Sequence, residues 1–219
     1  MSYLSRRFGP GTVLALSLLG MMALFPLALF AQESEPDVEV AIPRYSLGDN
    51  TLSMRLGVGL PLFLLATEAV ETHRGDSQHV LSPNLSFMGT AAVNWNAYLD
   101  PSFTIGMEVS GALAITNNAA LLYLVPILAR GGYVISTSQM EIPLMLGLGA
   151  MVMRLADQTG VAFTLQPAAS FLWRATSDWS FGVTAEYWFT WEPPWGEGND
   201  TPHLFGNFVT ATATAVYHF

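Results

Sequence analysis

The chain has 219 residues, of which 51% are hydrophobic, and its formal net charge is −9. Acidic residues outnumber basic ones 17 to 8, and none of the basic residues is a lysine, so binding to nucleic acid or to an anionic headgroup surface is disfavoured. No cysteine is present, which excludes structural disulfides and lipid attachment through a thiol.

Residues 1–31 have the features of a secretory signal peptide. Arg6 and Arg7 form a positive start, residues 12–30 form an apolar run, and the residues up to Ala31 suit cleavage after that position. The acidic segment that follows favours cleavage over the alternative, an uncleaved membrane anchor. No later apolar run reaches the roughly 17–25 residues that a spanning helix needs.

Residues 32–50 are acidic and contain Pro36 and Pro43. Such a composition disfavours a packed core. We interpret the segment as a short periplasmic linker or a plug-like N-terminus.

From residue 51 onward, the sequence divides into eight segments in which apolar and polar residues alternate. A period of two places successive side chains on opposite faces of a strand. In an exported, hydrophobic chain without helical spans, this pattern predicts an all-β fold, an eight-stranded antiparallel up-and-down transmembrane β-barrel over residues 51–219. The segments are 51–66, 80–99, 103–116, 120–136, 139–155, 161–175, 179–191 and a terminal strand that includes 209–219.

The connections between these segments alternate in length, as they do in bacterial barrels. Tight turns at 100–102, 137–138 and 176–178 are expected at the inner end, together with the N-terminus. Long polar connections at 67–79 and 192–203 are expected at the outer end. Aromatic residues fall near both ends of the outward faces, where amphipathic rings sit at headgroup level. The alternative, a soluble barrel or β-sandwich, would turn its polar face outward.

The terminal strand ends in an aromatic residue at the carboxylate. Its apolar face consists of Val209, Ala211, Ala213, Ala215, Tyr217 and Phe219. This strand resembles the C-terminal signal of outer-membrane β-barrels, with Tyr217 and Phe219 at its tip, although Ala213 and Thr214 stand where that signal often has a glycine. The resemblance implies an outer-membrane location in a diderm bacterium and contact with the barrel-assembly machinery and with outer-membrane lipid.

Six charged residues fall on the inward faces of the predicted strands: Arg55, Glu108, Arg130, Glu141, Arg174 and Glu186. A buried charge without a partner is costly, and the interior of an eight-stranded barrel is only wide enough for its own side chains. We interpret these residues as an internal network of ion pairs that fills and stiffens the barrel. The alternative is a gate that opens a narrow path by exchanging ion-pair partners.

Several prolines lie inside the predicted strands, where each removes a donor from the hydrogen-bond ladder. Pro126, with Arg130 and Tyr133 after it, resembles the proline-bearing strand of the OmpW/OprG family of small barrels. That resemblance implies a lateral opening, bordered by Pro61, Pro83 and Pro126, through which small apolar molecules leave the lumen for the bilayer. The alternative is that the prolines mark local bulges that curve the sheet.

Histidines occur in the outer connections, at His73, His79 and His203, and on the terminal strand at His218. No spacing singles out a nucleophile or an acid–base pair, so we expect no enzyme activity, no metal and no cofactor. The sequence thus predicts a monomeric barrel of the OmpW/OprG or OmpA/OmpX kind that is a narrow passive channel for small solutes, hydrophobic ones included. The alternative is a structural or adhesin-like barrel that contacts partner molecules without transport.

Overall fold

A computed structural model of the chain describes residues 45–71, 77–81, 85–116, 119–137, 139–155, 158–193 and 203–219. All of them belong to one compact unit that spans residues 42–219. No helix in these ranges is long and apolar enough to cross a membrane. The predicted signal peptide, residues 1–31, lies outside the described part of the chain.

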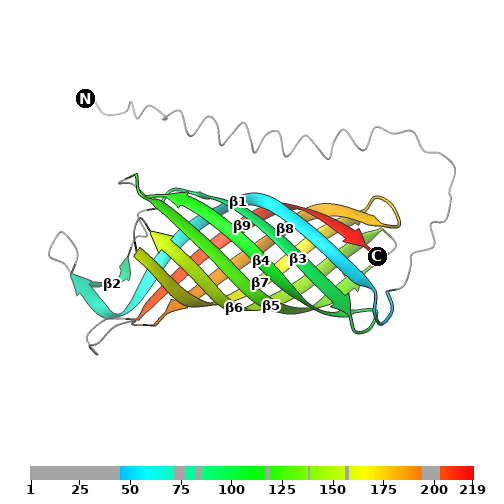
Figure 1. The fold of residues 1–219 in the computed structure, drawn as a ribbon, viewed down its shortest axis with the longest axis horizontal. Helices are drawn as coiled ribbons and strands as arrows, with labels where there is room; N and C mark the ends of the chain where they lie inside the picture. Colours follow the sequence, from blue (N-terminus) through cyan, green and yellow to red (C-terminus); the bar gives the residue numbers. More distant parts are fainter. Residues whose placement is uncertain are drawn as a thin grey trace, which may run out of the picture. The chain divides into compact units, whose positions relative to one another are not determined.

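The described residues form nine antiparallel strands in one closed sheet (Figure 1). β1 pairs with β9 on one side and with β3 on the other, so β1 and β3–β9 close a ring of eight strands, while β2 pairs only with the far end of β1. The predicted fold class is confirmed. The strands are β1 (Asn50–Glu71), β2 (Ser77–Leu81), β3 (Met88–Tyr98), β4 (Phe103–Ile115), β5 (Leu121–Ser136), β6 (Met140–Leu155), β7 (Gln158–Arg174), β8 (Trp179–Glu192) and β9 (Leu204–His218).

Burial alternates residue by residue along these strands, as the two-residue period predicts. In β4, Met107 is 61% exposed on the outer face, whereas Glu108 is 1% exposed on the inner face. Leaving an apolar side chain in water forfeits about 1.5–3 kcal/mol relative to burying it. Rows of exposed apolar residues on β1 and β3–β9 therefore require a lipid surround, and the polar residues turn inward.

The predicted second strand differs from the observed one. Segment 80–99 is divided between β2 and β3, and Leu85 forms only an isolated bridge with Thr116. Pro83, in the sequence between the two strands, has no N–H to donate to a ladder; its own position lies outside the described residues. Segments 103–116 to 179–191 coincide with β4–β8 within three residues.

The two termini of the barrel meet at the end that carries the short turns, which we call the inner end (Figure 1). Asn50 N–H donates to the Phe219 carbonyl at 2.8 Å, and Phe219 N–H donates to the Asn50 carbonyl at 3.0 Å. In the turn between β3 and β4, the Asp100 carboxylate accepts the backbone N–H groups of Ser102 and Phe103, at 2.7 and 2.8 Å. These contacts fix the inner rim.

Aromatic rings pair near both ends of the barrel. At the inner end, ring centroids lie 5.1 Å apart for Trp179 and Tyr217 and 5.7 Å apart for Tyr217 and Phe219. At the outer end, the Phe163 and Trp191 rings lie 5.4 Å apart. The two aromatic belts flank the aliphatic band of the outer face.

Candidate functional site

The barrel interior is divided along its axis into three layers. An apolar layer lies toward the outer end, a layer of ion pairs follows it, and a polar chamber lies toward the inner end. The layering follows from which inward positions of each strand carry apolar or polar residues.

The outermost layer, the apolar cluster, is built from inward residues near the outer ends of the strands. Met88 and Met151 are fully buried, and Trp188 is 1% exposed. Side chains of this size occupy the bore completely at that level. The cluster consists of Met88, Ala112, Ala114, Leu124, Met151, Ala162, Trp188 and Phe208.

The middle layer, the charge cluster, consists of Arg55, Glu108, Arg130 and Glu186. Each arginine makes ion pairs with both glutamates, and all four side chains are at most 3% exposed. The residues come from β1, β4, β5 and β8. Glu108 and Arg130 lie on the neighbouring strands β4 and β5, whereas the other three pairs join strands that are not neighbours. Two positive and two negative charges balance, which offsets part of the cost of their desolvation.

Uncharged groups add hydrogen bonds to the two glutamates of the charge cluster. The Asn94 amide donates to Glu108 at 3.4 Å, and the Trp188 indole N–H and the Thr210 hydroxyl donate to Glu186 at 3.3 and 3.4 Å. Trp188 thus belongs to two layers, because its ring packs in the apolar cluster while its N–H donates to Glu186 of the charge cluster.

The remaining two predicted charges form a separate pair near the inner end. Arg174 makes an ion pair with Glu141, and both also contact Tyr45. The six inward charges therefore form two groups, one of four residues and one of two.

Tyr45 occupies the inner mouth, although it precedes the first strand. Its ring stacks on Tyr98 with centroids 4.0 Å apart and an interplanar angle of 13°. Its hydroxyl donates to Glu141 at 2.5 Å and lies 3.0 Å from His218 Nδ1. Arg174 lies over the same ring at 5.0 Å. We call this set of contacts the Tyr45 socket.

Burial raises the pKa of the Tyr45 hydroxyl above its ordinary value, and the nearby Tyr98 and Glu141 add to that shift. The hydroxyl is therefore protonated at neutral pH and is the donor toward the Glu141 carboxylate. Sequence reasoning missed Tyr45, because a residue ahead of the strands belongs to no alternating pattern.

A Ser–His contact lies beside the socket. Ser180 Oγ is 2.8 Å from His218 Nε2, which is the spacing of a nucleophile and its base. Ser180 is fully buried, however, so a substrate cannot reach its Oγ. Within the described residues, no group of three histidine or acidic side chains could hold a metal ion; the side chains of His73 and His79 lie outside the described part.

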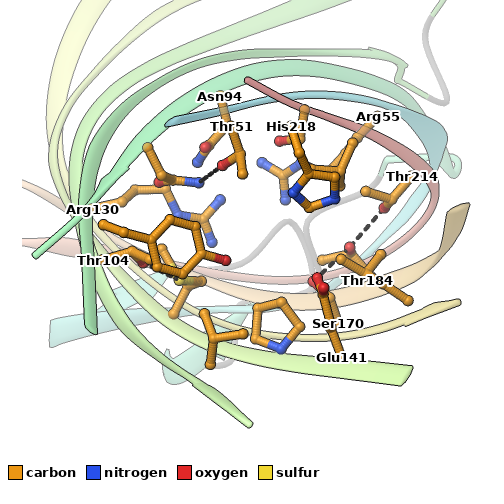
Figure 2. A pocket seen from close by; sticks show the side chains of 18 residues that line it. Thr51, Arg55, Asn94, Thr104, Arg130, Glu141, Ser170, Thr184, Thr214 and His218 are labelled. Atoms are coloured by element: carbon orange, nitrogen blue, oxygen red, sulfur yellow. Dashed lines mark hydrogen bonds between the residues drawn. The ribbon is translucent and has the colours of Figure 1, made fainter. Parts of the chain in front are cut away.

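The innermost layer is a polar chamber of about 50 Å³ between the charge cluster and the Tyr45 socket. Figure 2 shows Arg55 and Arg130 reaching toward its centre from opposite walls. Threonine and serine hydroxyls line it, including the chain of contacts from Ser170 to Thr184 at 2.8 Å and from Thr184 to Thr214 at 2.7 Å.

Several buried polar atoms around the chamber have no hydrogen-bond partner among the described residues. They include the Nε atoms of Arg55 and Arg130 and the Oδ1 atoms of Asn94 and Asn96. Buried polar groups in proteins are satisfied by protein or by water. A chamber of this volume has room for a few water molecules, because one water needs about 10–15 Å³ by the same measure.

The prolines interrupt the ladders in two ways. At Pro126 the β4–β5 ladder breaks off after the Val109–Ile127 pair and resumes at the Ala112–Leu124 pair, without a change of register. At Pro61 the β1–β9 register shifts, which is a bulge. Pro83 lies outside the described residues.

The break at Pro126 borders the apolar cluster. Ala112 and Leu124, where the ladder resumes, both belong to that cluster, and so does Met151, the partner of Pro126 on β6. Gly111 lies in the same break and has no side chain to cover it. We call residues 110–111 and 125–126 the β4–β5 seam.

Three solved structures with a similar fold are distant from this chain in sequence. OprG of Pseudomonas aeruginosa is 10% identical over 80% of this chain and 97% of its own, with a TM-score of 0.48. Neisserial surface protein A is 11% identical over 78% and 97%, with a TM-score of 0.49. Ail of Yersinia pestis, solved with the heparin analogue sucrose octasulfate, is 11% identical over 79% and 99%, with a TM-score of 0.45. Likenesses at this level leave the activity of this chain open.

No curated protein matches the chain in sequence. A family model matches residues 32–217.

Proposed function

The chain belongs to the family whose model matches residues 32–217, and we propose that it is a monomeric outer-membrane barrel that passes small apolar molecules from the cell surface into the bilayer. In this proposal the chain is exported by the signal peptide of residues 1–31. It takes up solute at the outer end and releases it sideways through the β4–β5 seam.

The juxtaposition of the apolar cluster and the seam carries this proposal. An apolar molecule that displaces the flexible side chains of Met88 and Met151, which repack readily, enters a lining that is apolar at Ala112 and Leu124, next to the seam, and polar at Thr90 and Gln166. From there the seam is the adjacent wall, and it lacks the ladder pairs at Pro126. Beyond it lies the lipid-facing side of Val125, which is 40% exposed.

Passage straight along the axis is less favourable. An uncharged solute would have to separate the ion pairs of the charge cluster, which are desolvated and in three cases join strands that are not neighbours. Breaking a buried pair costs about 3–5 kcal/mol. A sideways exit above that layer leaves all four charges paired, so the solute leaves through the wall.

The second candidate is a structural or surface-interaction barrel without transport. The tight filling of the lumen favours it, because Met88, Met151 and Trp188 close the bore at 0–1% exposure. In that case the outer connections, and not the lumen, would carry the function.

Flux of a small apolar solute into proteoliposomes separates the two candidates. Pro126→Ala restores a ladder donor worth about 0.5–1.5 kcal/mol, so seam opening and flux are expected to fall about two- to tenfold. Pro143→Ala is the matched control, because Pro143 also lies in a ladder break, between β6 and β7, but lines the polar chamber instead of the apolar cluster.

A reversible lock tests the same seam without removing the proline. Val109 and Ile127 are cross-strand partners at the edge of the break, and the chain has no native cysteine. A disulfide between Val109→Cys and Ile127→Cys should stop flux, and reduction should restore it. No flux in the unmodified protein, or flux indifferent to the lock, would leave the interaction barrel as the function.

A further inference from the structure

The polar chamber has a ceiling and a floor of different kinds. The ceiling is the charge cluster, held by ion pairs between four strands. At the inner end, Tyr98, Glu141 and His218 line the chamber, and the Tyr45 ring, which no strand carries, lies against all three. Removal of the Tyr45 ring therefore disturbs no ladder pair of the barrel.

A tight turn over residues 46–49 places Tyr45 at the inner mouth of the barrel. The Ser46 N–H donates to the Asp49 carboxylate at 2.8 Å, and the Asp49 N–H donates to the Ser46 carbonyl at 3.1 Å. Gly48 sits in this turn at φ +98°, a left-handed conformation that favours glycine. Its N–H donates to the Tyr98 carbonyl at 3.1 Å, which fixes the turn to β3.

The contacts of Tyr45 are those of a reversible seal. The ring is 7% exposed and lies between Tyr98 and Arg174, while the hydroxyl reaches Glu141 and His218. Every partner belongs to the barrel wall, and each would remain in place if the ring left. Above the ring, the unpartnered Nε groups of the two chamber arginines require solvent.

We propose that Tyr45 is a lid on a solvent-holding chamber, and that the chamber exchanges water-sized polar solutes through the inner mouth only when the Tyr45 side chain swings out. The chamber offers donors from arginine and acceptors from asparagine and hydroxyl groups, beside apolar side chains such as Val134 and Leu172, so it can hold small hydrogen-bonding solutes. This inference is independent of lateral release above the charge cluster.

The cysteine-free chain allows a direct test with the full-length mature protein in detergent micelles. Thr214 lines the chamber and is 6% exposed, so Thr214→Cys reports access to it. Its rate of modification by a small, charged methanethiosulfonate reagent is compared with tyrosine and with alanine at position 45. Tyr45→Ala is expected to raise the rate at least about tenfold, since it removes the stacking, the hydroxyl hydrogen bonds and the cation–π contact together.

Two reference cysteines are the controls for the modification rate of Thr214→Cys. Ser177→Cys, in the exposed β7–β8 turn, should react at the same rate in both backgrounds. Ala114→Cys, in the apolar cluster beyond the charge cluster, should stay unreactive in both. Equal acceleration of Ala114→Cys and Thr214→Cys would mean that the whole barrel has loosened, and it would overturn the lid.

Tyr45→Phe keeps the test open if Tyr45→Ala does not fold. It retains the stack on Tyr98 but loses the hydroxyl contacts, so it should give a rate between those of tyrosine and alanine. If Thr214→Cys reacts as fast as Ser177→Cys with Tyr45 in place, or equally slowly in all three backgrounds, then Tyr45 does not control access and the proposal is wrong.

Discussion

A single carboxylate, that of Glu108, holds two guanidinium groups at once. It pairs with Arg55 and Arg130, and its side chain is fully buried. Glu108→Gln would leave two arginines sharing Glu186, and we expect the free energy of unfolding to fall by about 3–5 kcal/mol. Urea unfolding in lipid vesicles measures this loss.

Removing the charges as a pair should be milder. Glu108→Leu combined with Arg130→Met leaves Arg55 and Glu186 still paired, so the double variant should be more stable than Glu108→Leu alone. If the loss of stability in the double variant equals the sum of the losses in Glu108→Leu and in Arg130→Met, the two residues do not interact energetically.

Tyr45 predicts a pH dependence of access to the chamber. The socket raises the pKa of its hydroxyl, chiefly through burial and then through Tyr98 and Glu141, while Arg174 opposes the shift; His218 also faces it. A group whose docked pKa is raised stabilises docking fully below its free pKa, about 10, and loses that contribution as the pH rises further. The modification rate of Thr214→Cys, relative to Ser177→Cys, should therefore climb above about pH 10.

The Tyr45→Phe background is the control for this titration, because phenylalanine has no proton to lose. There the ratio of the two rates should be independent of pH over the same range. The same rise in both backgrounds would assign the effect to another group.

Single positions were predictable from the sequence where the two-residue period applies to them. Glu108, Arg130 and Glu186 point inward because each lies at an even spacing from other inward residues of its strand. Their grouping was not predictable, because it depends on the depth at which non-neighbouring strands such as β1 and β4 face each other. Tyr45 precedes every strand, and a tyrosine in an acidic, proline-containing segment gives no pattern to read.

At the scale of strands, alternation predicted which segments form strands and which side chains face inward, but not where the strands are interrupted. The pattern runs through residues 80–99 without a break, yet β2 and β3 are separate. Register survives at Pro126 because a one-residue slip would turn Leu124 and its inward neighbours toward lipid. At Pro61 the ladder instead accommodates the proline by a bulge, a choice that the sequence does not reveal.

The end of β9 offers a prediction that separates assembly from stability. Phe219 closes the inner rim with two backbone hydrogen bonds to Asn50, and its ring contacts Tyr217. If Tyr217 and Phe219 form an assembly signal, Phe219→Ala should sharply lower the amount of folded barrel inserted in cells while it changes the urea midpoint of refolded protein little, because the backbone bonds remain.

Phe163→Ala is the matched change at the opposite belt, where the Phe163 ring stacks on Trp191. It removes a comparable aromatic contact but no terminal residue, so insertion in cells should be nearly unchanged. If both variants lower the amount of folded barrel inserted in cells equally, Phe219 contributes only through its packing.

At the scale of the whole molecule, the distribution of polarity is the reverse of that in a water-soluble domain. Arginine and glutamate side chains are buried at the centre, while Val183 is 60% and Leu148 is 63% exposed on the outside. The free energy that a soluble protein gains by burying such residues comes here from lipid. The apolar outer surface, and not the contacts inside the lumen, is therefore the reason that the barrel needs a membrane around it.

Spin labels in lipid vesicles test this surface directly. A label at Val183→Cys, on the outward face of β8, should be accessible to oxygen, which concentrates in hydrocarbon, and shielded from a water-soluble nickel complex. A label at Ser177→Cys, in the inner turn, should show the opposite ranking because it lies in water. If the nickel complex reaches position 183 as readily as position 177, hydrocarbon does not cover the strand faces, and both lateral release through the β4–β5 seam and the membrane location lose their basis.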